Sequence, residues 1–287
     1  MRILLFGANG QVGSEFQALK TSHDIIAVTR EMADLSTAGA AEHLINDIKP
    51  DAIVNAAAYT AVDKAEEEQS LAASINTHAV GEISNTAKNI GAAFIHISTD
   101  YVFDGTANTP YKEEAPANPQ NVYGATKLDG EIAALANNLD AFVLRTSWVY
   151  SPYGNNFVKT MLRLGRERDA LTIVDDQVGG PTPASSIAAA AMTILNSPDR
   201  QIHGGVYHFQ GAPLVSWAGF AEAVFAAMKS ESDIATKVDK IPSSDYPTPA
   251  KRPLYTVLDC SRILRDFGIK QPDWQADVAM LVKQLGR

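Results

Sequence analysis

This chain has one cysteine, no long apolar run and no excess of positive charge. Each of these absences excludes a class of protein. The one cysteine, Cys260, allows no intrachain disulfide, and no Cys/His set has the spacing of a metal site. No apolar run would cross a bilayer, and the N-terminus lacks the regions of a signal peptide. A net charge of -9 disfavours a nucleic-acid groove. We therefore expect a cytoplasmic protein with neither membrane nor nucleic-acid partners.

A glycine-rich loop follows a short apolar run at the start of the chain. Residues 2–6 predict a buried parallel strand and residues 11–19 a helix. Between them Gly7 allows a tight turn and Gly10 lets a pyrophosphate approach the backbone, while Gly13 lets the helix pack closely on the strand. The free N–H groups of the helix would face the phosphates. This order predicts a dinucleotide site, although a plain strand-to-helix turn is the alternative.

Strand-like and helix-like segments alternate over the first half of the chain. Short β-rich runs occur at 24–28, 52–55, 92–98 and 141–145, with helical stretches between them. This pattern predicts an α/β fold with a doubly wound parallel sheet of the Rossmann type, whose ligands bind beyond the carboxyl ends of the strands. The residues that stand at those ends are Asn9, Arg30, Ala57 to Thr60, Thr99 and Trp148.

The second half is richer in proline and glycine, which indicates a different organisation. We expect a dinucleotide-binding core over 1–150, with a return segment at about 171–208. That return contains an Ala-rich helix, 185–195, suited to packing on the sheet. Residues 151–170 and 209–287 are expected to form a second, smaller substrate-binding lobe.

One tyrosine of the nine is followed by a lysine four positions later. Tyr123 and Lys127 would share a helix face, so the ammonium can stabilise the phenolate and make the phenol a usable acid. Such a pair also arises by chance, and the glycine loop makes it informative. His96, inside an apolar run, is interpreted as a structural strand histidine, and Glu66 to Glu68 as a solvated helix face.

Several segments together resemble the extended short-chain dehydrogenase/reductases and, more narrowly, the dTDP-4-dehydrorhamnose reductase family. These segments are Gly7 to Gly13, Asn55 to Glu66, Ser98 to Gly105, Asn121 to Lys127 and Asp176 to Thr182. The resemblance covers nearly the whole chain. It implies that Tyr123 is the general acid, that Lys127 lowers its pKa and holds the nicotinamide ribose, and that Thr99 hydrogen-bonds the reacting oxygen.

The resemblance also implies contacts to the cofactor. Gly10, Gln11 and Val12 match its pyrophosphate loop, and the stretch beside the cofactor is matched by Ala58, Tyr59 and Thr60. Asp34 and Leu35 match a segment at the adenine end, with helix capping as the alternative for Asp34. Asn76 matches a position at which related enzymes hold a structural water.

On the substrate side the resemblance assigns Asp100 and Trp148, where an indole can stack on a deoxysugar. A buried core tryptophan is the competing interpretation of Trp148. Asn156 is a candidate for the nucleotide part of the substrate, or equally a helix cap.

Arg30 bears on the choice of cofactor. An NAD-selective site usually has an acidic residue at the end of the second strand, whereas a guanidinium there favours a 2′-phosphate. The sequence thus predicts NADPH, with acceptance of NADH left open and a merely exposed Arg30 as the alternative.

Some relatives bridge two subunits through a metal held by acidic side chains. Residues 183–186 offer no carboxylate at the matching place, although Glu15 remains. We therefore expect no metal and leave a homodimer open.

The expected activity is the NADPH-dependent reduction of the 4-keto group of dTDP-4-dehydro-L-rhamnose, giving dTDP-L-rhamnose. Two alternatives stay open. One is another nucleotide-sugar reductase or epimerase of the same superfamily. The other is a non-catalytic regulatory subunit such as that of methionine adenosyltransferase. The sequence leaves the sugar stereochemistry and the nucleobase undecided.

Overall fold

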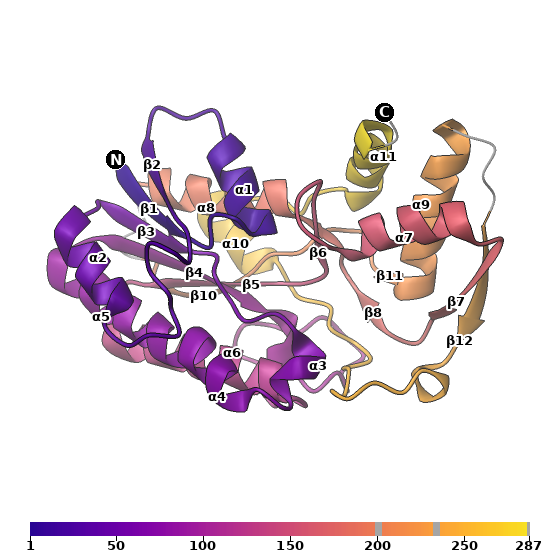
Figure 1. The fold of residues 1–287 in the computed structure, drawn as a ribbon, viewed down its shortest axis with the longest axis horizontal. Coiled ribbons are helices and arrows are strands. Elements are labelled where there is room, and N and C mark those ends of the chain that lie inside the picture. The colour runs from indigo at the N-terminus through magenta and orange to yellow at the C-terminus, as the bar shows by residue number, and fades with distance from the viewer. Residues whose placement is uncertain (199–202, 232–235, 286–287) are drawn as a thin grey trace.

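A six-stranded sheet forms the centre of the larger part of the molecule. The computed structural model describes residues 1–198, 203–231 and 236–285 (Figure 1). All neighbouring strands of the sheet are parallel, in the order β10-β5-β4-β3-β1-β2. The strands are β1 Arg2–Phe6, β2 Asp24–Val28, β3 Ala52–Asn55, β4 Ala93–Thr99, β5 Phe142–Thr146 and β10 Gly205–His208. The predicted doubly wound parallel sheet is confirmed.

The apolar side chains of β1 pack into hydrophobic cores on both faces of this sheet. Ile3 and Leu5 enter the core on one face, and Leu4 and Phe6 the core on the other. Helices therefore have to cover both sides. One side is covered by α1 Gln11–Ala18, α8 Ala184–Asn196 and α10 Ser261–Phe267. The other is covered by α2 Ala40–Ile48, α5 Ala79–Ile90 and α6 Val122–Asn137. Short helical segments α3 Val62–Ala65, α4 Gln69–Ala73, η1 Ser74–His78 and η2 Asp100–Val102 lie between strand ends and these helices.

A smaller lobe with its own apolar core stands beside the sheet (Figure 1). Its helices are α7 Phe157–Glu167, α9 Trp217–Glu231 and α11 Trp274–Leu285. Its short strands and its helical turn are β7 Ala170–Val174, β8 Val178–Gly179, β11 Val215–Ser216, β12 Lys237–Ile241 and η4 Ser243–Asp245. A two-stranded ladder of β6 Val149–Tyr150 and β9 Thr182–Pro183 joins the lobe to the core.

The expected return segment begins later in the structure. Strand β7, placed within that segment by the sequence analysis, pairs in parallel with β12, and its Leu171 and Ile173 lie in the apolar core of the smaller lobe. The chain rejoins the sheet with α8 and β10. The pairing of β7 with a strand more than sixty residues away leaves no local signal in the sequence.

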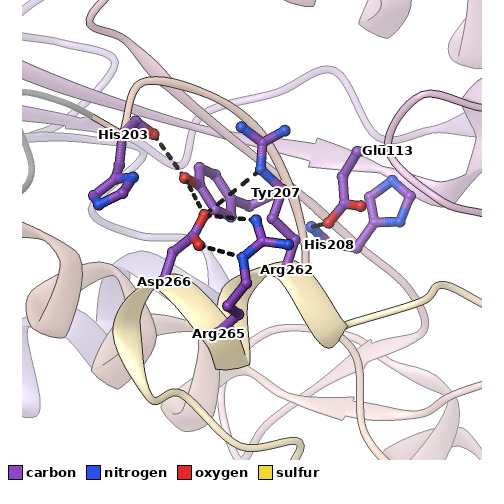
Figure 2. A network of polar contacts seen from close by, with 7 residues as sticks. All are labelled: Glu113, His203, Tyr207, His208, Arg262, Arg265 and Asp266. Carbon is purple, nitrogen blue, oxygen red and sulfur yellow. Dashed lines mark hydrogen bonds and ion pairs between the residues drawn. The ribbon is translucent and has the colours of Figure 1, made fainter.

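A second difference concerns the residues leading into α10, which were expected in the lobe. Leu258, Cys260 and Ile263 instead lie in the core beneath the sheet. Figure 2 shows the polar contacts that fasten α10 to β10: Tyr207 Oη lies 3.1 Å from the carboxylate of Asp266. Within the described residues, no helix is long and apolar enough to cross a membrane.

Candidate active site

A cavity of about 660 Å³ opens at the carboxyl ends of β1 to β5. Its lining includes every residue predicted to contact the cofactor except Gly13: Gly7, Asn9, Gly10, Gln11, Val12, Arg30, Asp34, Leu35, Ala57, Ala58, Tyr59, Thr60 and Lys127. Tyr123 lines it as well, whereas Thr99, Asp100, Trp148 and Asn156 lie outside the lining. In parallel sheets, ligands bind beyond the carboxyl ends of the strands, and the cavity lies at those ends.

The glycine loop has the geometry that its sequence predicts. Gly7 has φ +78°, and a Cβ there would come within 2.5 Å of the Ala57 nitrogen. A Cβ at Gly13 would overlap the carbonyl oxygen of Gly7, so this glycine allows close packing. A Cβ at Gly10 would meet only the Gly7 oxygen, at 3.3 Å. Gly10 caps α1 and thus leaves the first N–H groups of that helix facing an open approach.

Arg30 and Asp34, both in the lining of the cavity, form an ion pair. Arg30 Nε lies 3.0 Å from the Asp34 carboxylate, and the arginine side chain is 75% exposed. Hydrogen bonds from the backbone and hydroxyl of Ser36 lower the pKa of Asp34, as does Arg30. Asp34 therefore caps a turn at Ser36 and not the helix α2, whose N-cap is Gly39.

The stretch at Tyr59 is held by Asn76, on the π-helical turn η1. Asn76 accepts a hydrogen bond from the Tyr59 N–H at 2.8 Å and donates to the Tyr59 carbonyl at 3.1 Å. Its amide also donates to Thr126 Oγ1 on α6. The side chain thus ties the wall of the cavity to the helix that carries Tyr123 and Lys127.

Tyr123 stands in the first turn of α6, whose N-cap Asn121 accepts a hydrogen bond from the Gly124 N–H at 2.8 Å. Burial raises the pKa of Tyr123 to about 12, although a hydrogen bond with Thr99 lowers it. This differs from the expected lowering by Lys127. Desolvation is the largest effect on the pKa of the phenol, and the Lys127 amine contacts the Ile97 carbonyl and His96.

Lys127 is buried, and its Nζ donates to the Ile97 carbonyl at 2.7 Å and lies 3.1 Å from His96 Nε2. Burial lowers the pKa of Lys127 to about 8, although the charge of Glu131 raises it. His96 is fully buried in β4, as its interpretation as a structural histidine requires, and it contacts the candidate catalytic amine.

Thr99 ends β4 and Asp100 begins η2, so both point from one strand end. Thr99 Oγ1 lies 3.1 Å from Asp100 Oδ1 and accepts a hydrogen bond from the Tyr101 N–H. Burial raises the pKa of Asp100 to about 7. Its Oδ2 is buried and makes no full hydrogen bond among the described residues, although the Thr256 hydroxyl acts on the carboxyl and lowers its pKa.

Trp148 joins the core to the smaller lobe in an uncommon conformation. Its φ is +46°, which disfavours a bulky residue. The indole stacks on Trp217 with the ring centroids 3.6 Å apart, and Trp148 stays half-buried. Sequence reasoning missed Trp217, because nothing in the chain signals that α9 returns to this place.

Asn156 caps α7, which agrees with its interpretation as a helix cap. It accepts from the Lys159 N–H at 3.1 Å and donates to Gln11 Oε1 at 2.9 Å. Gln11 also donates to the Val149 carbonyl at 3.3 Å. These contacts join the glycine loop to the smaller lobe.

The acidic run at Glu66 to Glu68 is not simply solvated. Glu66 accepts a hydrogen bond from the Val122 N–H at the start of α6, and Glu68 accepts one from the Tyr59 hydroxyl. Glu15 has a raised pKa, because it is partly buried and lies near the charge of Asp277. No group of three or more metal-ligating side chains gathers in the part of the chain that the structure describes.

Further lining residues were given no role by the sequence analysis. Ile97, Ser98 and Thr146 stand at the ends of β4 and β5, so the rule for strand ends could have found them. Gly154 and Asn155 come from the loop before α7, where the sequence gives no such signal.

Comparison with known proteins gives one consistent result. The family model described as RmlD substrate binding domain matches residues 1–287. A dTDP-4-dehydrorhamnose reductase of Burkholderia thailandensis is 42% identical, covering 99% of each chain. The reductase of the same name from Escherichia coli K12 is also 42% identical, covering 99% of this chain and 98% of the relative.

Solved structures agree. A dTDP-4-dehydrorhamnose reductase of Bacillus anthracis in complex with NADP superposes with a TM-score of 0.91, at 32% identity and 99% coverage of both chains. A reductase of the same name from Clostridium acetobutylicum gives a TM-score of 0.93, at 36% identity and full coverage of both.

Proposed function

The chain belongs to the RmlD substrate-binding-domain family, and from this membership we propose that it reduces dTDP-4-dehydro-L-rhamnose to dTDP-L-rhamnose with NADPH. It is an NAD(P)H-dependent oxidoreductase of dTDP-rhamnose biosynthesis. The observation that carries the proposal is the place of Tyr123 and Lys127, in the wall of the cavity that begins at the glycine loop.

The residues of the cavity suit a dinucleotide. Gly10, Gln11 and Val12 would hold the pyrophosphate at the start of α1, where free N–H groups favour an anion. Arg30 would meet the 2′-phosphate, and Ala58 to Thr60 would flank the cofactor along its length. The absence of a side chain at Gly10 is what allows the close approach.

The chemistry needs a hydride and a proton. NADPH supplies the hydride when it is bound. Tyr123 donates its phenolic proton to the ketone oxygen as negative charge builds there, and Thr99 donates a second hydrogen bond to the same oxygen. Lys127 would hold the nicotinamide ribose. The phenol is protonated at neutral pH, as an ordinary tyrosine is, so the assignment rests on the place of Tyr123 in the cavity wall and not on its raised pKa.

The substrate side of the proposal rests on Asp100 and Trp148. The buried Asp100 Oδ2 offers an acceptor for a sugar hydroxyl. The indole of Trp148 offers an apolar surface at the junction of core and lobe, and the lobe would receive the nucleotide. The strained φ of Trp148 fits a functional position. We place the enzyme in the cytoplasm, where its single buried cysteine suits a reducing compartment.

The test is a panel of nucleotide 4-ketosugars, followed by the absorbance of NADPH. We expect turnover with dTDP-4-dehydro-L-rhamnose and the largest kcat/KM for it. A higher kcat/KM for another nucleotide ketosugar would reassign the substrate. Binding of NADPH without reduction of any member, together with stable association with another enzyme, would favour the regulatory-subunit alternative.

A further inference from the structure

The indole of Trp148 is covered on one face by Trp217, the first residue of α9. The two ring planes are 7° apart and their centroids 3.6 Å apart, so the rings lie face to face. Both side chains are half-buried. The third tryptophan of the chain, Trp274, is buried in the core of the smaller lobe. A ligand that reaches Trp148 therefore cannot use the face that Trp217 covers.

Gly179 lies over the other face of the same indole. A Cβ at Gly179 would come within 2.7 Å of Trp148 Cε2, and within 2.9 and 3.0 Å of the adjoining Nε1 and Cζ2. An approach in the ring plane would meet Nε1 or Cζ2 first, so Gly179 stands above the ring and not at its edge. Trp217 is not among these nearest atoms, which places the glycine on the opposite side. The accessible part of the indole thus lies on the Gly179 side and along the ring edge.

One short ladder carries both of these covers. Strands β8 and β11 pair antiparallel, with Val215 opposite Gly179, and Trp217 follows directly after β11 (Figure 1). Ser216 fastens the end of β11, because its hydroxyl donates to Asp175 at 2.5 Å and accepts from the N–H three residues on at 3.0 Å. The distance between the two covers is therefore set by strand pairing.

The backbone of Trp148 is fixed separately from its ring. Its φ of +46° is a conformation that a bulky residue keeps only when the surrounding structure holds it. The Trp148 carbonyl accepts from the Thr182 N–H at 3.2 Å, and the Ser147 hydroxyl donates to the Gly180 carbonyl at 2.7 Å. Hydrogen bonds of the backbone do not set the rotation of a side chain. The plane of the indole is set by the two surfaces that enclose it.

We propose that Trp217 is a positioning residue of the substrate site, which with Gly179 fixes the plane of the Trp148 indole against the sugar. The inference rests on the proposed function in taking Trp148 as a residue that contacts the substrate. A wall that can rotate does not hold a ketone in one place, and small errors of placement slow a reaction strongly. Trp217 therefore acts on the reaction through Trp148, without touching the sugar itself.

The stack also continues toward the cofactor side. Trp217 packs on Phe157, with the ring centroids 4.6 Å apart. Phe157 begins α7, whose cap Asn156 donates to Gln11 of the glycine loop at 2.9 Å. The plane of the indole is thus tied by direct contacts to the loop that would hold the pyrophosphate. This connection explains why a residue of the smaller lobe can position a sugar relative to the cofactor.

The first test needs neither substrate nor turnover. Spectra of the protein with ¹⁵N-labelled indoles contain one N–H signal for each of the three tryptophans, and Trp148→Phe assigns the signal of Trp148. A ring stacked on an indole shifts its signals upfield through the ring current. We expect Trp217→Leu to move the Trp148 signal downfield and Trp274→Phe to leave it in place. An unmoved signal in Trp217→Leu would overturn the stack, whatever the protein reduces.

The second test asks whether Trp217 acts through Trp148. We expect Trp217→Leu to lower kcat/KM for dTDP-4-dehydro-L-rhamnose by about tenfold, the upper range of what an aromatic pair contributes, with the Kd of NADPH unchanged. Trp217→Phe keeps a flat ring and should retain most of the wild-type value. In a Trp148→Leu background, Trp217→Leu should cause no further loss, because the effect passes through the missing indole. Trp274→Phe, in the core of the same lobe, is the control for lost stability.

Three results would contradict the proposal. Additive losses in the double variant would show that Trp217 acts independently of Trp148. A loss in Trp274→Phe as large as that in Trp217→Leu would show a general weakening of the lobe. A wild-type kcat/KM in Trp148→Leu would show that the indole does not contact the substrate, while reduction by the wild-type protein would leave the proposed function standing.

If Trp217→Leu fails to fold, Gly179→Ala displaces the indole from its other face. The added Cβ would overlap Trp148 Cε2, so we expect a shifted Trp148 signal together with a lower kcat/KM. A shifted signal with the wild-type kcat/KM would show that the plane of the indole does not matter for the reaction, and the proposal would fall.

Discussion

Three side chains from two neighbouring elements carry the proposed proton transfer. Thr99 ends β4, while Tyr123 and Lys127 occupy one face of α6, so a strand end and a helix start fix their spacing. The hydroxyl, the phenol and the amine belong to parts of the chain with little freedom, because β4 is central in the sheet and α6 packs across it. Such preorganisation is what general acid catalysis requires.

At the residue scale, Tyr123→Phe tests the acid directly. The ring and its edge-to-face contact with Tyr101 stay, and only the proton donor is lost. Loss of a general acid lowers the rate by about a hundred- to ten-thousand-fold. We expect that decrease in kcat, with the Kd of NADPH nearly unchanged by fluorescence titration. A variant that kept more than about a tenth of the wild-type kcat would remove Tyr123 from this role.

Arg30→Ala tests the choice of cofactor. The pair with Asp34 is exposed and contributes little stability, so the guanidinium is available to a 2′-phosphate. A hydrogen bond to a charged group contributes about 1.5–3 kcal/mol, which corresponds to about a ten- to hundredfold loss. We expect that loss in kcat/KM for NADPH alone, with Arg30→Lys intermediate. Equal losses for NADPH and NADH would refute the assignment.

Asp100→Asn tests the buried carboxyl through the pH dependence of stability. Burial raises the pKa of Asp100 to about 7, so the folded chain binds this proton more tightly than the unfolded chain. The protonated Asp100 carboxyl therefore stabilises the folded chain fully below about pH 4. This stabilisation is lost as the pH rises through about 7. We expect Asp100→Asn to melt higher than wild type at pH 8 and to lose this advantage near pH 4. A difference in Tm that is constant with pH would contradict the raised pKa.

At the scale of elements, the start of α6 positions the phenol. The Asn121 side chain caps the helix and also donates to the Lys251 carbonyl at 2.8 Å. We expect Asn121→Ala to lower the free energy of unfolding by about 1 kcal/mol and to lower kcat severalfold, because Tyr123 stands in the first turn. Asn121→Asp keeps the accepting oxygen and should lose less of both. Urea unfolding and steady-state kinetics measure the two effects, and equal losses in both variants would refute the capping account.

The sequence predicts those elements that have local signals, and it does not predict contacts between distant segments. The strand at residues 2–6, the glycine turn and the Ala-rich helix have local signals, namely apolar runs, fixed glycine positions and helix-forming residues. The pairing of β7 with β12, the return of α10 and the stack of Trp148 on Trp217 depend on contacts between distant segments. The lowered pKa of Lys127 likewise arises from burial, which the spacing of Tyr123 and Lys127 does not report.

At the scale of the whole molecule, the core and the smaller lobe meet around Gln11. This side chain belongs to the glycine loop and contacts Asn156 and Ser151 at the edge of the lobe. Binding of a nucleotide between the two parts would therefore position the ketone relative to Tyr123. Remote binding energy of this kind raises the rate at the reacting centre. We expect the free ketosugar, lacking the nucleotide, to show a much lower kcat/KM than the dTDP-linked sugar, and comparable values would contradict this account.

The most direct test of the central claim uses NADPH labelled with deuterium at the transferable C4 position and dTDP-4-dehydro-L-rhamnose. If Tyr123 and Thr99 receive the ketone beside the cavity, the label moves to the sugar carbon while a proton from the protein reaches its oxygen. The account predicts dTDP-L-rhamnose with deuterium at C4 of the sugar and at no other carbon, as seen by NMR. A product without deuterium at C4, or a rearranged sugar with the label retained on the cofactor, would contradict it.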